Sequence, residues 1–349
     1  MDSILAFEGL EAKAFKTKWQ APSNIAFVKY WGKKGYQLPS NPSVSLTLSK
    51  CQTQTSIEFI PGNELNVELF LDNEAKPTFA KKIHTFLTTL SKDISCLNNV
   101  SLLIHTHNTF PHGTGIASSA SGMAAFCLGL AEYLYFLKGK PLDEEFYKFA
   151  SYLSRLGSGS ASRSIYGGMV SWGEFENEEE MSDLFASPFK THEAFYNLRD
   201  SVVIVSSEEK AVSSRQGHGL MNEHPYAEAR FKEAMKNFKK TIDALRNGDW
   251  KTVGEVLENE ALQLHAMMLT SPESYILLKP ESLTLIEKVR AFRNKTNIPV
   301  YFTLDAGPNL HLIYPQNVEA EVRSFIDEEI GSSNFLIIHD SIGTGPSKC

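Results

Sequence analysis

The sequence predicts a mixed α+β protein of two domains. Its 349 residues suit two units better than one, because a single hydrophobic core rarely grows beyond about 250–300 residues. The first half mixes strand patterns and helix patterns, whereas long helical patterns and paired strands follow from about residue 200. We therefore expect an N-terminal α/β domain over residues 1–195 and a C-terminal α+β domain over residues 196–349, with ligands bound in the cleft between them.

The elements of the first domain follow from alternation and from helical periodicity. Strands are expected at residues 44–48, 54–60, 65–71 and 100–107, and after the turn at Gly167. Helices are expected at residues 79–91, 118–137 and 143–156. The acidic stretch at 176–183, ENEEEMSD, is expected to be a solvated surface loop.

The second domain opens with a β-branched run, SVVIVSS, which predicts a buried strand from Ser201. Helices are expected at residues 224–247, 249–269, 281–296 and 317–330. Strands are expected at residues 299–304, 310–314 and 334–339. The first two of these strands predict an antiparallel pair, so helices packed on a sheet are the expected architecture.

Composition argues against several classes of partner and compartment. A net charge of −7 disfavours nonspecific binding to nucleic acid or to an anionic membrane, so we expect neither. No apolar run is expected to reach the length of a membrane span, and the acidic N-terminus predicts no signal peptide. The cysteines lie far apart and form no CxxC pair, which favours reduced thiols in a cytoplasmic protein. They are Cys51, Cys96, Cys127 and Cys349.

The most informative stretch is NTFPHGTGIASSASG at residues 108–122. A predicted strand leads into it, and a helix of small residues leaves it. Glycine allows the backbone to approach a ligand closely, and a helix start offers unpaired N–H groups to an anion. The stretch predicts a phosphate loop, although an ordinary strand–turn–helix connection remains open. No lysine follows Gly115, so the loop is not of the Walker type, and a cation must come from elsewhere in the chain or from a metal ion.

Two further clusters combine cations with hydroxyl groups. KYWGKK at residues 29–34 could hold a polyanion or could be a basic surface turn around Trp31. SRLGSGSASRS at residues 154–164 could hold phosphate oxygens through its hydroxyls and Arg163, or could be a flexible linker. The adjacent helix pattern argues against the linker.

Three single positions have both a functional and a structural interpretation. Arg215, in SSRQG, could bind an anion or lie in an exposed loop. Asp305, in TLDAGPN, stands at a predicted strand end, where a carboxylate could act as a general base or could satisfy turn amides. His265, in LQLHAMML, fits a packed helix histidine better than a ligand. Taken together, the clusters suit a phosphate donor and an anionic acceptor.

These motifs, in this order, resemble the GHMP kinase superfamily, whose phosphate loop PxxxGLxSSA is matched by PHGTGIASSA at residues 111–120. Within it the chain closely resembles the diphosphomevalonate decarboxylase family, over segments from Ala21 to Asn309. The segments are APSNIAFVKYWGKK, NPSVSLTLS, NTFPHGTGIASSASG, SRLGSGSASRSIYGG, SSRQG, LHAMML and YFTLDAGPN. KYWGK, SGSASR and DAGPN are specific to this family rather than to the superfamily at large.

The resemblance implies a two-domain GHMP-kinase-like fold, with an N-terminal α/β domain like that of a ribosomal protein and a ferredoxin-like C-terminal domain. It also implies ATP-dependent decarboxylation of (R)-5-diphosphomevalonate, with ATP and Mg²⁺ as cofactors, a small-molecule substrate and a homodimeric state. Phosphomevalonate decarboxylase and mevalonate 3-kinase are the alternatives on the same scaffold. A nucleotide-binding sensor without turnover is the alternative from another class.

The resemblance also implies roles for individual residues. The catalytic residues are Asp305, which would accept or orient a hydroxyl proton, Lys29 and Arg163. The substrate-binding residues are Asn24, Tyr30, Trp31, Gly32, Lys33, Ser158, Gly159, Ser160, Ala161, Ser162, Arg163, Ser214 and Arg215. The ATP-binding residues are Asn108, Pro111, Gly113, Gly115, Ala117, Ser118 and Ser119, with Ser119 also the candidate Mg²⁺ ligand.

The sequence departs from the family pattern at three places. The loop reads HGTGIASS where relatives commonly read TAAGLASS, and Gly35 stands where an acidic residue is common. The C-terminal DSIGTGPSKC also differs from the usual ending, and we attach no function to it. None of these departures removes a catalytic group.

Overall fold

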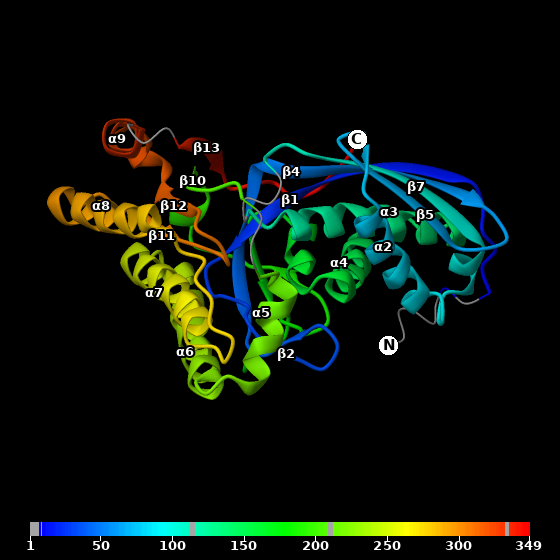
Figure 1. Cartoon of the computed structure of the whole chain (residues 1–349), viewed down its shortest axis with the longest axis horizontal. Helices are drawn as coiled ribbons and strands as arrows, with labels where there is room; N and C mark the ends of the chain where they lie inside the picture. Colours follow the sequence, from blue (N-terminus) through cyan, green and yellow to red (C-terminus); the bar gives the residue numbers. More distant parts are fainter. Residues whose placement is uncertain (1–6, 8, 112–115, 209–211, 332–334) are drawn as a thin grey trace.

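The structure is a computed structural model that describes residues 7, 9–111, 116–208, 212–331 and 335–349, without the side chains of Ser214 and Arg215. It has two lobes, each a sheet covered by helices (Figure 1). The mixed α+β class and the two-lobed architecture expected from the sequence are confirmed. The boundary at residues 195 and 196 stays a prediction.

The N-terminal sheet is built on two long antiparallel strands, β1 (Phe15–Ala26) and β4 (Ser43–Pro61). Within the described residues it has eight strands. Six follow the order β14-β1-β4-β7-β5-β6, β8 also pairs with β4, and β9 pairs with β8. The strands beside β1 and β4 are β5 (Asn66–Leu71), β6 (Glu74–Ala75), β7 (Val100–Asn108), β8 (Met169–Trp172), β9 (Ser187–Pro188) and β14 (Ser347–Lys348). A short hairpin, β2 (Lys33–Lys34) and β3 (Leu38–Pro39), lies apart from this sheet.

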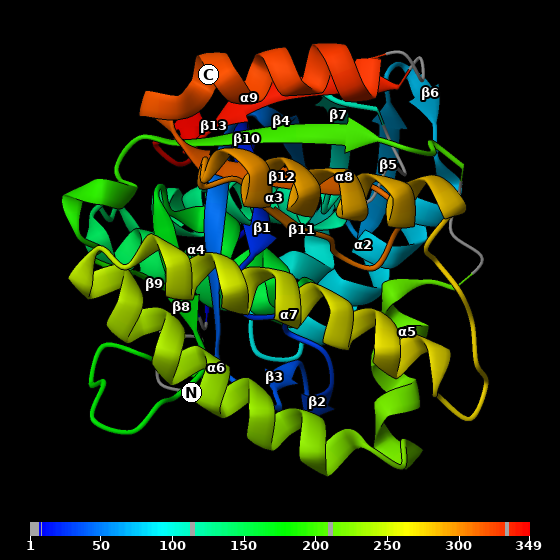
Figure 2. The same cartoon turned by 90° about the vertical axis from the view of Figure 1, so that its left-hand side faces the viewer.

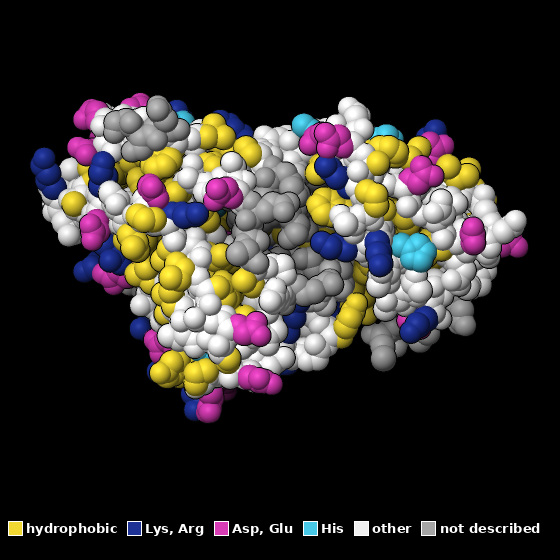
Figure 3. Space-filling view, viewed as in Figure 1, with side chains coloured by type: hydrophobic (Ala, Val, Ile, Leu, Met, Phe, Trp, Pro, Cys, Tyr) yellow, Lys and Arg dark blue, Asp and Glu magenta, His cyan; other side chains and the backbone are white. Residues whose placement is uncertain are grey.

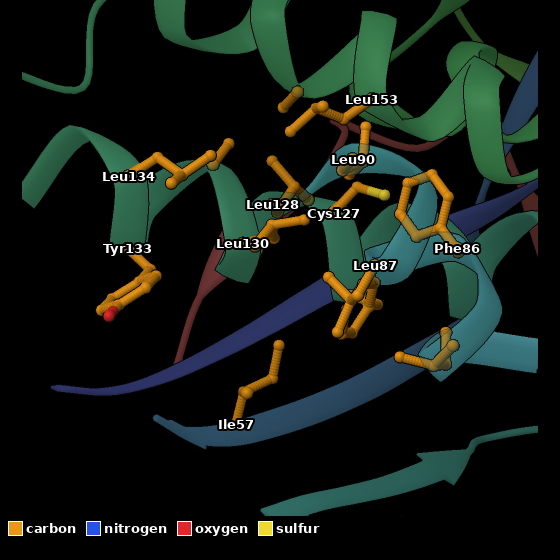
Figure 4. Packing of buried hydrophobic residues seen from close by; sticks show 14 of the residues in the cluster. Ile57, Phe86, Leu87, Leu90, Cys127, Leu128, Leu130, Tyr133, Leu134 and Leu153 are labelled. Atoms are coloured by element: carbon orange, nitrogen blue, oxygen red, sulfur yellow. The ribbon is translucent and has the colours of Figure 1, made fainter. Parts of the chain in front are cut away.

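Three helices cover one face of this sheet (Figure 1). They are α2 (Pro77–Leu90), α3 (Ser118–Lys138) and α4 (Glu144–Gly157). Figure 4 shows Leu87 of α2, Leu128 of α3 and Leu153 of α4 gathered over Ile57 of β4. A Cβ atom at Gly129 would lie 2.8 Å from the Ile57 side chain, so glycine is what lets α3 lie this close to the sheet.

Helix α3 corrects one expectation from the sequence, because it is long and apolar enough to cross a membrane by length and composition. However, 78% of its most apolar window is buried inside the protein. Its small residues pack between the sheet and α4. The helix is apolar because it lies in the centre of the core.

The C-terminal lobe is a four-stranded antiparallel sheet, of order β11-β12-β10-β13 in the described chain, with helices packed against it (Figure 2). Its strands are β10 (Leu198–Ile204), β11 (Tyr301–Thr303), β12 (Leu310–Pro315) and β13 (Leu336–Ser341). Its helices are α5 (Ser214–Leu220), α6 (Ala227–Asn247), α7 (Trp250–Leu269), α8 (Pro280–Thr296) and α9 (Glu319–Phe325). The predicted antiparallel pair near residues 299–314 is confirmed as β11 and β12.

Short helical turns connect these elements. The one that matters for the site is the 3₁₀ helix η2 (Gly159–Ile165), which directly follows α4. The others are η1 (Ser95–Asn99), η3 (Glu193–Phe195), η4 (Met221–Glu223), η5 (Gln316–Val318) and η6 (Ile326–Ile330). The last is a π-helical turn that continues α9, so the helix expected at 317–330 is divided.

The expected strands 44–48 and 54–60 form one continuous strand, β4, so the predicted break between them is wrong. The polar residues between them do not turn because the carboxylate of Asp340, in β13, accepts their backbone N–H groups. Ser49 and Lys50 donate at 3.0 and 2.7 Å, and Cys51 donates at 2.8 Å. The second lobe therefore holds the middle of the longest N-terminal strand.

The end of the chain returns to the first lobe. Trp19 and Gln20 of β1 pair with Lys348 and Ser347 of β14, and the Lys348 ammonium contacts the buried carboxylate of Glu132 in α3. A strand that follows the whole C-terminal lobe thus completes the edge of the N-terminal sheet.

Candidate active site

An ion pair joins the two lobes at the centre of the site. Lys29 follows β1, and its Nζ lies 2.9 Å from Oδ1 of Asp305, just beyond β11. The same Nζ donates to the Ala26 carbonyl at 2.8 Å. The Lys29 side chain is buried, whereas 28% of the Asp305 side chain is exposed. Burial lowers the pKa of Lys29, and Asp305 opposes that shift.

Arg163, in η2, stands close enough to influence both charges. Its Nε donates to Oδ1 of Asn24 at 3.3 Å, and its Nη1 donates to the Ser43 hydroxyl at 2.5 Å. Burial lowers its pKa to about 10, which Asp305 opposes. Arg163 in turn lowers the pKa of Lys29. The structure therefore brings all three residues expected to be catalytic into one electrostatic cluster.

The KYWGKK segment forms an aromatic wall beside this cluster. The Tyr30 ring lies edge-on to Trp172, with centroids 4.7 Å apart. His218 of α5 contacts both Tyr30 and Trp31, with ring centroids 4.4 and 4.6 Å away. Burial raises the pKa of Tyr30, and its buried hydroxyl has no hydrogen-bond partner among the described groups. A polar ligand atom would satisfy that hydroxyl.

His218 anchors this wall through the backbone. Gly32 donates its N–H to Nδ1 of His218 at 3.0 Å. Burial lowers the pKa of His218 to about 3, with smaller contributions from Lys33 and Arg163, so the ring is neutral. Gly32 has a φ of +106°, and a Cβ there would lie 2.6 Å from Phe231. The glycine in KYWGKK is therefore required by conformation and by space.

The serine- and glycine-rich stretch is a compact 3₁₀ turn and not a flexible linker. A Cβ at Gly159 would lie 2.7 Å from both the Tyr30 hydroxyl and the Trp172 ring, so only glycine fits. Ser162 is buried and donates its hydroxyl to the Gly159 carbonyl at 2.8 Å. The Ser162 side chain therefore stabilises the turn, and its contact with substrate stays a prediction. Ser158 and Ser160 are half-buried, and Ala161 is fully buried.

The described part of the phosphate stretch adjoins the same cluster. Ala117, at the start of α3, has left-handed backbone angles, and no side chain among the described residues caps this helix start. Ser118 is half-buried and Ser119 is exposed in the first turn. The Ser23 hydroxyl donates to the Ile116 carbonyl, which ties the loop to the residue before Asn24. The N–H groups of an uncapped helix start suit an anion.

The structure gives the positions of several other predicted site residues, but it does not test their roles. Lys33 lies in β2, Pro111 lines a cleft of about 710 Å³ beside β10, and Asn108 ends β7 and accepts from Thr53 at 2.7 Å. Gly113 and Gly115 lie outside the described residues, as does His112. So do the side chains of Ser214 and Arg215. Residues 7, 9–111, 116–208, 212–331 and 335–349 contain no group of three His, Cys, Asp or Glu side chains suited to a metal ion.

Two charged residues buried behind the ion pair were not identified from sequence patterns. Glu260 of α7 accepts the Lys29 backbone N–H at 2.8 Å and pairs with Arg230 of α6 at 2.6 Å. His265 is packed, as expected, and its Nε2–H donates to the Asp305 carbonyl at 3.1 Å. The only sequence signal was a charge in an otherwise apolar helical face, which is also typical of a solvated position.

The fold and the site together define a class of protein. A strand leads through a glycine- and serine-rich connection into a buried helix, and a second α+β lobe brings an aspartate to Lys29, just after β1. This is a GHMP-type fold, which the chain shares with solved structures.

Two family models match consecutive parts of the chain. The diphosphomevalonate decarboxylase-like N-terminal domain matches residues 21–183, and the mevalonate 5-diphosphate decarboxylase C-terminal domain matches residues 201–347. The diphosphomevalonate decarboxylase of Saccharomyces cerevisiae is 32% identical over 333 residues, covering 89% of this chain and 81% of the relative. The chain therefore belongs to the diphosphomevalonate decarboxylase family.

Solved structures agree with this membership. A mevalonate diphosphate decarboxylase from Enterococcus faecalis is 28% identical, with a TM-score of 0.83 over 97% of this chain and 99% of that chain. A structure of MDDEF in complex with MVAPP, AMPPCP and magnesium is 29% identical, with a TM-score of 0.84 and the same coverage.

Proposed function

We propose that the protein catalyses the ATP-dependent decarboxylation of (R)-5-diphosphomevalonate to isopentenyl diphosphate, with ADP, phosphate and CO₂ as the other products. The observation that carries this proposal is the Lys29–Asp305 pair at 2.9 Å between the lobes, with Arg163 in electrostatic reach of both residues. Family membership and the neighbour with MVAPP, AMPPCP and magnesium support it.

Asp305 acts in the first step, in which the tertiary hydroxyl of the substrate attacks the terminal phosphorus of ATP. A tertiary alcohol is a weak nucleophile, so a carboxylate at hydrogen-bond distance helps by accepting or orienting its proton. The adjacent Lys29 ammonium favours the ionised form of that carboxylate and offsets negative charge on the transferring group.

Arg163 and Asp305 act in the second step. The C3–O bond to the new phosphate breaks, and the electron pair of the bond to the carboxyl carbon forms the alkene as CO₂ leaves. Positive charge develops at C3, and the Asp305 carboxylate stabilises it. Arg163 binds the substrate carboxylate or a nearby phosphate, with Asn24 and Ser43 fixing the orientation of its guanidinium.

The helix start at α3 suits the nucleotide and its metal. ATP with Mg²⁺ supplies the phosphoryl group. Ala117 provides no side-chain cap, so the first N–H groups of α3 suit phosphate oxygens. Ser118 and Ser119 add hydroxyls there, and Ser119 is our candidate Mg²⁺ ligand. Tyr30, Lys33, the η2 turn and Arg215 are proposed to bind the rest of the acceptor.

The test is turnover of three candidate acceptors. ADP and CO₂ are measured with mevalonate diphosphate, phosphomevalonate and mevalonate, each with ATP and Mg²⁺. We expect equal amounts of ADP and CO₂ with the diphosphate. CO₂ release only with phosphomevalonate, ADP without CO₂ or binding without turnover would each refute the proposal, in favour of the sibling decarboxylase, a 3-kinase or a sensor respectively.

We further propose that the enzyme is a cytoplasmic homodimer. Support for the compartment comes from the described thiols, which are all free, with Cys51, Cys96 and Cys127 buried and Cys349 exposed. We also propose, from the net charge of −7, that neither nucleic acid nor a membrane is a partner. Charges of both signs are interspersed on the face in Figure 3. Sedimentation of the purified protein tests the dimer.

A further inference from the structure

We propose that helix α7 acts as a bracket that sets the geometry of the Lys29–Asp305 pair, with Glu260 and His265 as positioning residues. The inference rests on the proposed function, because it concerns the pair that carries it. Glu260 holds the main chain of Lys29, and His265 holds the main chain of Asp305. The two residues stand five positions apart on one helix, or about 7.5 Å along its axis.

The Lys29 end of the bracket is buried and fully paired through Glu260. One oxygen of Glu260 accepts the Lys29 N–H at 2.8 Å and Nη2 of Arg230 at 2.6 Å. The other accepts Nη1 of Arg230 at 2.9 Å and Asn237 at 2.8 Å. Glu260 is 0% exposed. A buried carboxylate with four hydrogen bonds is held in one position, so the backbone that it binds is held as well.

The opposite side of Lys29 is restrained too. Its carbonyl accepts from the Asn41 side chain at 3.2 Å. With its N–H bound to α7 and its carbonyl bound to Asn41, the Lys29 peptide has little freedom to shift. Only the side chain remains to be placed, and the contacts of Nζ with the Ala26 carbonyl and Asp305 do so.

The Asp305 end of the bracket depends on His265. Asp305 lies in a turn between β11 and β12, where its carbonyl also accepts the Gly307 N–H at 2.7 Å. The Nε2–H of the buried His265 bonds this turn to α7 at the Asp305 carbonyl, and the Ser282 hydroxyl of α8 bonds it further along, at the Pro308 carbonyl, at 2.7 Å. Without it, the turn is held to α7 less directly, and the distance between the carboxylate and Lys29 is less well defined.

The bracket explains why Glu260 and His265 lie on the same helix. Lys29 and Asp305 belong to different lobes, so their separation would change with any movement of one lobe against the other. Because α7 binds the backbone of both, such movement is coupled to breaking a buried hydrogen bond. A misplacement of about 1 Å in a catalytic site can lower turnover on the order of 100-fold.

The test uses two substitutions at His265, one at Glu260 and one control elsewhere on α7. At His265, H265L removes the donor, whereas H265Q keeps an N–H donor at a similar reach. At Glu260, E260Q removes the charge that Arg230 pairs with. The matched control is E258Q, because Glu258 is a buried residue of the same helix whose carboxylate pairs with Arg293 of α8, at 2.6 Å.

We expect H265L and E260Q to lower kcat on the order of 10- to 100-fold, with KM for both substrates within about threefold. H265Q and E258Q should stay within about threefold of wild-type kcat. Equal losses of kcat in E260Q and E258Q, or in H265L and H265Q, would overturn the inference in favour of a merely structural role, as would an unchanged kcat in H265L.

A crystal structure of H265L gives a readout that does not depend on turnover. We expect the Lys29–Asp305 contact to lengthen beyond hydrogen-bond distance or to be lost. If the wild-type enzyme releases no CO₂ from mevalonate diphosphate, the proposed function fails, and this distance still tests the bracket. An unchanged contact in H265L overturns the bracket whatever the reaction proves to be.

Discussion

Replacing Asp305 by asparagine tests the central step of the mechanism with little change of shape. The amide keeps an oxygen that can accept from Lys29 but cannot take a proton from the substrate. General base catalysis contributes on the order of 10²- to 10⁴-fold, so we expect kcat to fall by about that factor. The dissociation constants for ATP and for mevalonate diphosphate should stay within a few-fold, because Arg163 and the α3 start are untouched.

The same substitution removes the attraction between two unit charges. At the 2.9 Å separation of Lys29 Nζ and Asp305 Oδ1, with an effective dielectric constant of about 20, that attraction is about 6 kcal/mol. Solvent reaches 28% of the Asp305 side chain, so the loss in unfolding free energy should be smaller than this upper limit. Because the opposing carboxylate is gone, the pKa of Lys29 should fall further below its ordinary value.

The assays are single-turnover kinetics, titration calorimetry for binding and urea denaturation for stability. The control is E233Q, which removes a surface carboxylate paired with Lys236 at 3.2 Å and should change kcat less than about twofold. A kcat of D305N within tenfold of the wild type would refute the assigned role. So would a loss of ATP affinity large enough to account for the whole defect.

Three further substitutions have defined outcomes. R163Q should lower kcat/KM by several orders of magnitude, or about 3–5 kcal/mol, because a charge-assisted contact with the substrate is lost, and a change below tenfold would count against it. G159A should lower the free energy of unfolding by about 1–3 kcal/mol in urea melts, because its Cβ would lie 2.7 Å from the Tyr30 hydroxyl, whereas G122A, with nothing within 4 Å, should not destabilise. In the wild type, acidification from pH 7 to pH 5 protonates His218 only in the unfolded state, because its folded pKa of about 3 lies below the ordinary 6.5. The free energy of unfolding should therefore fall by about 2 kcal/mol through this group. The H218F variant should lack that part of the pH dependence.

The local elements of the fold were predictable because their signals are local. The alternation in residues 100–107 and the small-residue run after Ser118 correspond to β7 and α3. Strand β1 was missed because Pro22 and the polar KTKWQ run disfavour a strand, and its register shifts between Pro22 and Asn24. Its other stabilising partner, β14, follows the entire second lobe, so no local pattern indicates the pairing.

For the site, the sequence indicated which residue types matter but not how they meet. Lys29 and Asp305 are 276 positions apart, and their contact depends on how the lobes pack. Glu260 and Arg230 were missed because a charged residue in a helical pattern is usually solvated, and only the packing of α6 and α7 buries this pair. Sequence alone also does not show that the Ser162 hydroxyl donates within its own turn.

The return of β14 to β1 means that the two lobes are not separable modules. A fragment cut near residue 195 would lack the strand that pairs with Trp19 and Gln20, and it would leave Glu132 without its contact to Lys348. The exposed edge of such a fragment would be open to self-association. We therefore expect the edge of the first lobe to be completed only once residues far downstream are available, and long-range pairing of this kind slows folding.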